Sequence, residues 1–279
     1  MRDAPIGIFD SGIGGLTVAR AVHRLLPAES TVYLGDTARV PYGPKSPDVV
    51  RRYSREILAW LLTQQVKAVV VACNTATAHA LSDLQARSPV PVIGVIEPGA
   101  RAAVAATRSG RVGVIGTAGT IASGAYRRAL LAERTDLEVF EQSCPLLVPL
   151  VEEGWFDRPA TRMIAEEYLA SLQSAGIDVL VLGCTHYPML KPLIAQIMGP
   201  GVALIDSGDE TARAVAAVLH ERNLGAGPED RPVQRWIATD DAARFARVGA
   251  IFMGGGPAPV EVVNLESVPA SAEDVPGRV

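Results

Sequence analysis

Lysine, cysteine and long apolar runs are scarce in this 279-residue sequence, and each scarcity disfavours a class of function. Lysine occurs only at Lys45, Lys67 and Lys191, so a Schiff base with pyridoxal phosphate has few anchors. No apolar run approaches the roughly 20 residues of a membrane span. No signal-peptide segment precedes the first glycine-rich turn. The sequence therefore predicts a cytosolic protein that does not contact a membrane.

An excess of positive charge is also missing. The formal net charge is -4, and the basic residues are scattered along the chain. Proteins that bind nucleic acid usually gather basic residues into a patch or stripe. We therefore expect no nucleic acid partner.

The three cysteines, Cys73, Cys144 and Cys184, are too few for a disulfide framework. Their odd number and the absence of an export signal predict reduced thiols. No C-x-x-C spacing occurs, which argues against a structural zinc site and against a local redox dithiol. We expect no metal. Cys144, which precedes a proline, is interpreted as an inert packed residue.

Short runs rich in valine, isoleucine and leucine alternate with longer stretches of helical periodicity. This alternation is typical of βαβ units and predicts an α/β fold with mostly parallel, buried sheets. Strands are expected at residues 6–9, 31–34, 68–72, 92–95, 112–115, 137–141, 179–183 and 203–206. Helices are expected at residues 16–26, 47–65, 76–86, 121–134, 158–175, 189–197 and 210–222, followed by a strand, a helix and a strand within residues 234–265.

The two halves of the sequence repeat this order of elements. The segment "IGIFDSGIGGLT" at residues 6–17 resembles "VGVIGTAGTIAS" at residues 112–123, and a cysteine follows each at a similar interval. Such an internal repeat indicates two copies of one structural unit. We therefore predict two pseudo-symmetric Rossmann-like domains, with an active site in the cleft between them.

The domain boundaries are expected where the repeat begins and ends. The first domain is predicted to comprise residues 1–97 and 208–265, and the second residues 98–207. Residues 266–279 lack periodicity and are expected to form a disordered tail.

Cys73 and Cys184 occupy equivalent places, in "VVVACNTAT" and "LVLGCTHYP". Each follows an apolar strand at the carboxyl edge of its sheet, where open α/β sheets bind ligands. Two thiols on opposite walls of a small cavity suit proton transfer at one carbon from two faces. A free thiol has a pKa of about 8.5, so a thiolate and a thiol coexist after modest tuning. This arrangement predicts a two-base racemase.

Two further residues are candidates for managing protons. Asp10, in the first turn, is a candidate partner for Cys73, and His186 lies two positions after Cys184. A purely structural histidine remains an alternative for His186. The glycine-rich turns lack the marks of a P-loop or dinucleotide site, but their backbone N–H groups suit a carboxylate.

The motifs "IFDSGIGGLT", "GDTARVPYG", "ACNTAT", "GVIGT" and "LGCTHYP", in this order within residues 6–207, closely resemble those of the glutamate racemases. These are pyridoxal-phosphate-independent enzymes of the aspartate/glutamate racemase superfamily. The resemblance implies interconversion of L- and D-glutamate without a cofactor, supplying D-glutamate for peptidoglycan. It implies that Cys73 takes the proton from D-glutamate and Cys184 from L-glutamate, and it assigns assisting roles to Asp10, His186 and Glu152.

The resemblance also implies a set of substrate-binding residues. They are Asp10, Ser11, Tyr42, Gly43, Asn74, Thr75, Thr117, Thr120, Thr185 and His186. We further expect a homodimer. Two alternatives stay open: an aspartate racemase, whose substrate is one methylene shorter, a difference worth about 1–3 kcal/mol in a pocket, and a non-catalytic amino-acid binding protein.

Overall fold

The computed structural model describes residues 2–227, 231–255 and 259–265. The tail expected at residues 266–279 lies outside this range. Within the described residues, no helix is both long and apolar enough to cross a membrane.

Six parallel strands form the first sheet, in the order β10-β9-β2-β1-β3-β4. Runs such as "AVVV" in β3 are apolar at every position because helices cover both faces of the sheet. The strands are β1 (Ile6–Asp10), β2 (Thr31–Gly35), β3 (Ala68–Val71), β4 (Val92–Gly94), β9 (Gln234–Ala238) and β10 (Val260–Val262).

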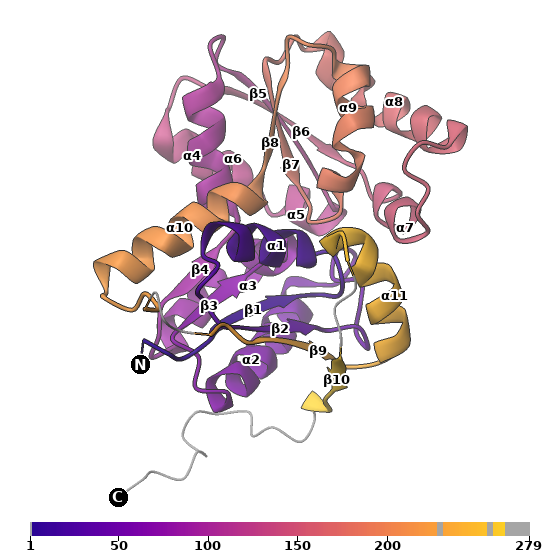
Figure 1. Ribbon diagram of the computed structural model, residues 1–279. Helices are drawn as coiled ribbons and strands as arrows, with labels where there is room; N and C mark the ends of the chain where they lie inside the picture. The colour runs from indigo at the N-terminus through magenta and orange to yellow at the C-terminus, as the bar shows by residue number, and fades with distance from the viewer. Residues whose placement is uncertain (1, 228–230, 256–258, 266–279) are drawn as a thin grey trace, which may run out of the picture.

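Successive side chains of these strands pack into different clusters. Ile8 belongs to the cluster on the face covered by α1 (Leu16–Leu25), α10 (Ser207–Glu221) and α11 (Ala242–Met253). Phe9 packs on the other face, with α2 (Pro47–Thr63) and α3 (Asn74–Arg87). The first sheet is thus the middle of three layers, as Figure 1 shows.

Four parallel strands form the second sheet, in the order β6-β5-β7-β8. They are β5 (Arg111–Gly116), β6 (Glu138–Ser143), β7 (Val179–Gly183) and β8 (Ala203–Asp206). One face packs against α4 (Ile96–Ala106) and α6 (Ala125–Glu133). The other packs against α7 (Leu147–Glu152), α8 (Pro159–Ser174) and α9 (Lys191–Met198).

The second sheet repeats the strand order of the first. In the first half β1 pairs with β2 and β3, and β3 with β4; in the second half β5 pairs with β6 and β7, and β7 with β8. The prediction of an α/β fold built from two pseudo-symmetric parallel sheets is therefore confirmed. Cys73 and Cys184 follow β3 and β7, the equivalent inner strands of the two halves.

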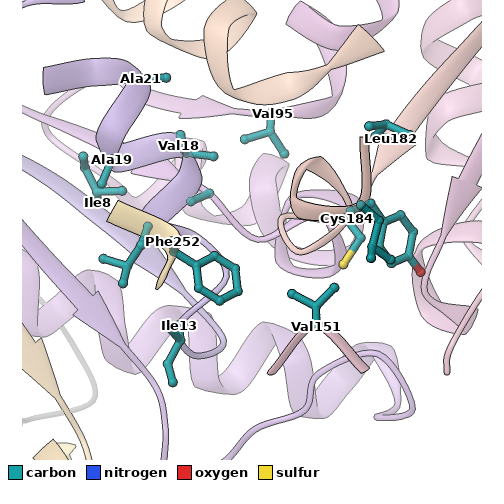
Figure 2. Packing of buried hydrophobic residues seen from close by; sticks show 14 of the residues in the cluster. Ile8, Ile13, Val18, Ala19, Ala21, Val95, Val151, Leu182, Cys184 and Phe252 are labelled. Atoms are coloured by element: carbon teal, nitrogen blue, oxygen red, sulfur yellow. The ribbon is translucent and has the colours of Figure 1, made fainter. Parts of the chain in front are cut away.

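The chain passes between the sheets twice, each time by a helix. α4 leads from β4 to β5, and α10 leads from β8 back towards β9, lying between the two sheets in Figure 1. The two helices also pack against each other. One hydrophobic cluster continues from Ile8 and Val18 of the first half to Leu182 and Cys184 of the second, so the halves share a core (Figure 2).

Some predicted elements were wrong in detail. The helices α4 and α7 were not predicted. The single helix expected at 121–134 is two, α5 (Ala118–Ala122) and α6, because Gly124 adopts a φ of +63° that ends helical geometry. The helix expected at 189–197 begins as a 3₁₀ turn, η1 (Tyr187–Leu190), before α9.

Candidate active site

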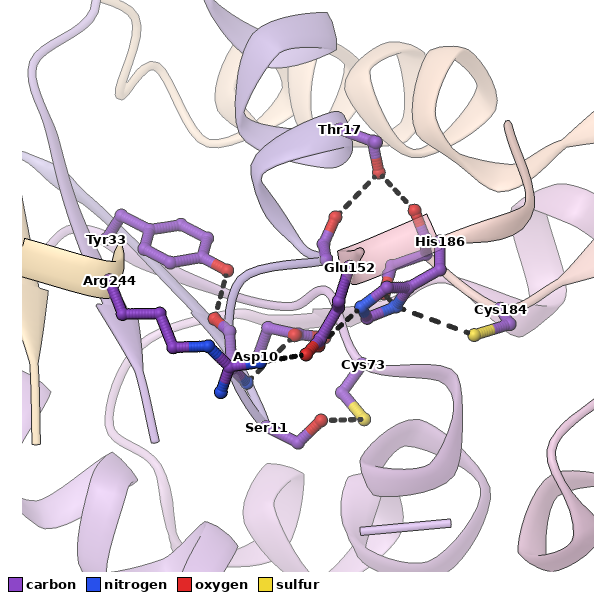
Figure 3. A network of polar contacts seen from close by, with 12 residues as sticks. Asp10, Ser11, Thr17, Tyr33, Cys73, Glu152, Cys184, His186 and Arg244 are labelled. Atoms are coloured by element: carbon purple, nitrogen blue, oxygen red, sulfur yellow. Dashed lines mark hydrogen bonds and ion pairs between the residues drawn. The ribbon is translucent and has the colours of Figure 1, made fainter. Parts of the chain in front are cut away.

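The two cysteines lie on facing sides of the boundary between the sheets, as Figure 3 shows. Cys73 caps α3, and its Sγ accepts a hydrogen bond from the Ala76 N–H at 3.4 Å. Cys184 stands before η1, a 3₁₀ turn rather than the α-helix that was expected, and its carbonyl accepts from Tyr187 N–H at 3.1 Å. Each cysteine is 6% exposed, so substrate would be shielded from bulk water between them.

A carboxylate and a hydroxyl lie beside Cys73. Asp10, at the end of β1, is buried, and its Oδ2 accepts from the Gly12 N–H at 3.0 Å. The Cys73 thiol donates to the Ser11 hydroxyl over 3.7 Å. Burial, followed by the charge of Asp10, raises the pKa of Cys73 to about 12. Cys73 is therefore a protonated thiol near neutral pH.

The group beside Cys184 carries the opposite charge to the carboxylate beside Cys73. His186 Nδ1 lies 3.9 Å from the Cys184 sulfur, and His186 Nε2 lies 3.0 Å from Glu152 Oε1. Burial lowers the pKa of His186, but its hydrogen bonds to Cys184 and Glu152 outweigh burial and raise that pKa. A protonated imidazole beside Cys184 stabilises negative charge on the sulfur.

Glu152 shows what reasoning from residues alone missed. It was assigned through the resemblance only, since an acidic pair in a loop is usually solvated. In the structure it ends α7, a short helix whose buried Leu147 and Val151 hold it against the core. The spacing of those two apolar residues is a signal for the helix, but nothing in the sequence indicates that the helix docks beside His186.

Three threonine hydroxyls join the two halves next to Cys73. Thr75, from α3, lies 2.9 Å from the hydroxyl of Thr117 and 3.1 Å from that of Thr120, both from the second half. Nearby, the Tyr126 hydroxyl donates to Asn74 Oδ1 at 2.7 Å. The structure thus brings these four predicted contact residues together at the domain boundary.

The predicted contacts at Tyr42 and Gly43 lie at the edge of this group. The Gly43 carbonyl accepts from the Gly119 N–H at 2.9 Å, which connects the two halves. The Tyr42 hydroxyl instead donates to Asp36 Oδ2 at 2.5 Å, and the ring is fully buried. This hydrogen bond fixes the Tyr42 side chain against the loop that follows β2.

Thr185 contributes to the same boundary on the side of His186. Its hydroxyl lies 3.5 Å from His186 Nδ1, and its carbonyl accepts from the Thr17 hydroxyl of α1 at 3.1 Å. Thr185 is itself buried. This predicted contact residue therefore ties the second thiol's loop to the first domain.

Two buried polar atoms at this boundary have no hydrogen-bond partner within the described part of the chain. They are Asp10 Oδ1, an acceptor, and Asn74 Nδ2, a donor. Buried polar groups in native structures are nearly always satisfied, so such atoms indicate a bound molecule or water. An acceptor and a donor beside Cys73 match the ammonium and carboxylate of an amino acid.

Across residues 2–227, 231–255 and 259–265, no group of three or more His, Cys, Asp or Glu side chains is arranged to hold a metal ion. All three cysteines are free thiols.

Comparisons with known proteins agree with this geometry. A family model described as Asp/Glu/Hydantoin racemase matches residues 6–215. A glutamate racemase of Geobacter metallireducens is 52% identical over 262 residues, covering 94% of this chain and 97% of that protein. The crystal structure of a glutamate racemase isoform from Bacillus anthracis has a TM-score of 0.92 and 40% identity, covering 95% of this chain and 99% of that one.

A further match comes from a complex. The glutamate racemase of Francisella tularensis, solved in complex with D-glutamate, has a TM-score of 0.90 and 36% identity, covering 96% of this chain and all of that one, 100%. These matches confirm the resemblance found in the five motifs. The chain belongs to the Asp/Glu/hydantoin racemase family.

Proposed function

We propose that this protein interconverts L- and D-glutamate by moving a proton between two thiols and the α-carbon, without a cofactor. The observation that carries the proposal is the pair of buried cysteines at equivalent strand ends, with an anionic neighbour at Cys73 and a cationic one at Cys184. The neighbours of the two thiols thus differ in charge, which suits a racemase that uses one thiol as an acid and the other as a base.

The reaction from L-glutamate then runs in two proton transfers. The Cys184 thiolate removes the α-proton, and the electron pair left on the α-carbon is delocalised into the adjacent carboxylate. The Cys73 thiol gives its proton to the opposite face, which yields D-glutamate, a thiol at Cys184 and a thiolate at Cys73. His186 stabilises the negative charge of the Cys184 thiolate. Asp10 and Ser11 lie beside the Cys73 thiol, which holds the proton to be transferred.

The polar groups at the boundary would bind the amino acid. Asp10 Oδ1 is placed to accept from the substrate ammonium, and Asn74 Nδ2 to donate to a carboxylate. Ser11, Tyr42, Gly43, His186 and the hydroxyls of Thr75, Thr117, Thr120 and Thr185 are proposed to complete the site. The assignment of glutamate is supported by relatives that are glutamate racemases, one of them solved with D-glutamate.

The proposal extends to the protein's place in the cell. D-glutamate made here would supply peptidoglycan synthesis. A cytosolic location suits the mechanism because it keeps thiols reduced, and all three cysteines are free. A homodimer is the proposed assembly, which light scattering on the purified protein would measure.

The decisive experiment compares Cys73→Ser and Cys184→Ser with Cys144→Ser, whose buried thiol lies outside the two-cysteine pair. Circular dichroism should show that either of the first two variants abolishes racemisation of glutamate, while the third keeps it. The assay is run with a chelator, without added pyridoxal phosphate, and with aspartate as a second substrate.

Hydrogen exchange in D₂O separates the two roles. Cys73→Ser should exchange the α-proton of L-glutamate only, and Cys184→Ser that of D-glutamate only. Full racemase activity in either variant would disprove the two-thiol mechanism, and faster turnover of aspartate would disprove the substrate.

A further inference from the structure

Arg244, an arginine of the first domain, contacts Glu152, the carboxylate of the second domain that lies beside His186. Arg244 lies in the first turn of α11, and its Nη2 pairs with Glu152 Oε2 at 2.8 Å. Glu152 lies in α7, on the other side of the domain boundary. In Figure 3 the guanidinium of Arg244 extends to the carboxylate that also reaches His186. No sequence motif singled out Arg244.

The two oxygens of Glu152 have different partners. Oε1 lies 3.0 Å from His186 Nε2, and Oε2 is held by Arg244. With one oxygen fixed by a cation, the other is oriented towards the imidazole, so the carboxylate cannot rotate freely. The result is a continuous chain of contacts from Arg244 through Glu152 and His186 to the sulfur of Cys184.

Other carboxylates near Glu152 make the positive charge of Arg244 important for keeping Glu152 ionised. Asp240 and Asp241 line the same cavity as Glu152 and Arg244, a cavity of about 120 Å³. Asp241 caps α11 through Arg244 N–H, and Asp10 interacts electrostatically with both Glu152 and His186. Asp10 therefore repels the charge of Glu152, and two more carboxylates line the same cavity, so a negative charge on Glu152 is favoured when nearby cations balance it.

We propose that Arg244 is a positioning residue for the racemase: across the domain boundary it keeps Glu152 ionised and aimed at His186, so that His186 stays protonated beside Cys184. This inference rests on the proposed function for its kinetic consequences, but the ion-pair chain exists independently of it. Arg244 does not touch the sulfur and acts only through Glu152 and His186.

The electrostatics of the pair agree with this geometry. Burial raises the pKa of Glu152, but the hydrogen bond and charge of His186, together with Arg244, outweigh it and lower that pKa. Glu152 in turn is one of the groups that raise the pKa of His186. Loss of Arg244 should therefore raise the pKa of Glu152. Loss of the positive charge alone would raise the pKa of His186, so a fall in the His186 pKa would report that the hydrogen bond from Glu152 is no longer aimed at the ring.

The first test titrates His186 by NMR in the substrate-free protein, following its ring nitrogens in the wild type, Arg244→Met and Arg244→Lys. Because the Glu152 hydrogen bond is lost from the ring, we expect the His186 pKa to fall by about one unit in Arg244→Met, against the rise that loss of the positive charge alone would cause. It should return most of the way in Arg244→Lys. Arg247→Met, an exposed arginine one turn along the same helix, is the matched control and should leave the titration unchanged.

The second test measures the pH profile of kcat/KM for L-glutamate. The enantiomers have equal free energy, so kcat/KM is the same in both directions and one direction suffices. Arg244→Met should move the alkaline limb to lower pH by about one unit, since one pKa unit of His186 moves it equally. A merely structural loss would lower kcat/KM at all pH values without moving the limb.

The outcomes are distinguishable from failure of the proposed function. If the wild type does not racemise glutamate, the proposed function is wrong, yet the NMR titration still tests the ion-pair chain. If the His186 pKa of Arg244→Met equals or exceeds that of the wild type, the positioning role of Arg244 is refuted. Melting temperatures show whether each variant is folded. If Arg244→Met does not fold, Arg244→Lys still tests the proposal.

Discussion

At the scale of single residues, the two thiols have equivalent positions but opposite electrostatic neighbours. Cys73 faces the carboxylate of Asp10, and Cys184 faces the imidazole of His186, which Glu152 supports. The pseudo-symmetry of the fold places the sulfurs. In the proposed mechanism, the difference between their neighbours would make Cys73 the proton donor and Cys184 the proton acceptor for L-glutamate.

Asp10 and Ser11 should shift the pKa of Cys73 in opposite directions. Asp10→Asn removes a negative charge that raises this pKa, so the pH midpoint of Cys73 alkylation should move down. When Cys73 is a thiolate, the Ser11 hydroxyl can donate to its sulfur and so lowers the pKa; Ser11→Ala removes this donor, so the midpoint should move up. Iodoacetamide labelling over a pH series, with Cys73 quantified by peptide mass spectrometry, measures both.

Labelling of Cys144 in the same samples is the internal control, because Cys144 is buried away from Asp10 and its pKa is raised mainly by burial. Its midpoint should stay constant in both variants. If the pH midpoint of Cys73 alkylation moved down in both Asp10→Asn and Ser11→Ala, increased access of the reagent, and not charge, would control the reaction.

At the scale of elements, the β1–α1 turn brings the first domain against the second thiol. Gly14 lies in this turn, and a β-carbon there would overlap the hydroxyl of Thr185 and the ring of His186. The turn and the Cys184 loop are also tied by the hydrogen bond from Thr17 to Thr185. A glycine is needed here for close approach between domains, since its backbone φ is not in the left-handed region.

Gly14→Ala should therefore reduce activity by displacing His186. Displacement of a reacting group by about 1 Å can lower the rate by about 100-fold, so we expect a fall in kcat/KM of roughly 10- to 100-fold. Gly201→Ala is the control, because a β-carbon at Gly201 meets open space. Wild-type kcat/KM in Gly14→Ala would show that the two loops can separate without consequence.

Elements with a strong periodic signal were predictable, and those fixed by tertiary contacts were not. The apolar runs of β3 and β7 identified both cysteine-bearing strand ends, and the repeat identified the order of strands. Helix α7 was missed because it has only six residues, so its periodic signal is limited to the single apolar pair Leu147 and Val151. Because this helix was not predicted, the position of Glu152 was not predicted either. Arg244 was missed because its partner, Glu152, is 92 positions away in the sequence.

At the scale of the whole molecule, function and structural support occupy opposite ends of the first sheet. The thiol of Cys73 follows the carboxyl end of β3, whereas Lys67 precedes its amino end. The Lys67 ammonium pairs with Glu29 at 2.5 Å, and both side chains are almost fully buried. Lys67 also donates to the Arg2 carbonyl, and Glu29 accepts from Ala226 N–H at 2.8 Å. This ion pair joins four segments that are distant in sequence.

Breaking this ion pair should destabilise the fold and leave the chemistry intact. Removing one partner of a buried pair leaves an uncompensated charge, which costs about 3–5 kcal/mol. We therefore expect Lys67→Met and Glu29→Gln each to lower the free energy of unfolding in urea by that amount. The double variant should lose clearly less than the sum, because the second substitution removes the charge that the first one stranded.

The free energy of unfolding and kcat together decide whether the two ends of the sheet are independent. The control for the unfolding measurement is Arg162→Met, which removes an exposed pair with Glu166 and should change the free energy of unfolding by less than about 1 kcal/mol. At a temperature where all variants are folded, kcat should equal the wild-type value, since the substitutions lie at the strand ends opposite Cys73. Additive losses in the double variant would contradict the pairing of Lys67 with Glu29. A fall in kcat among fully folded variants would show instead that the amino ends of the strands control the geometry of the thiols.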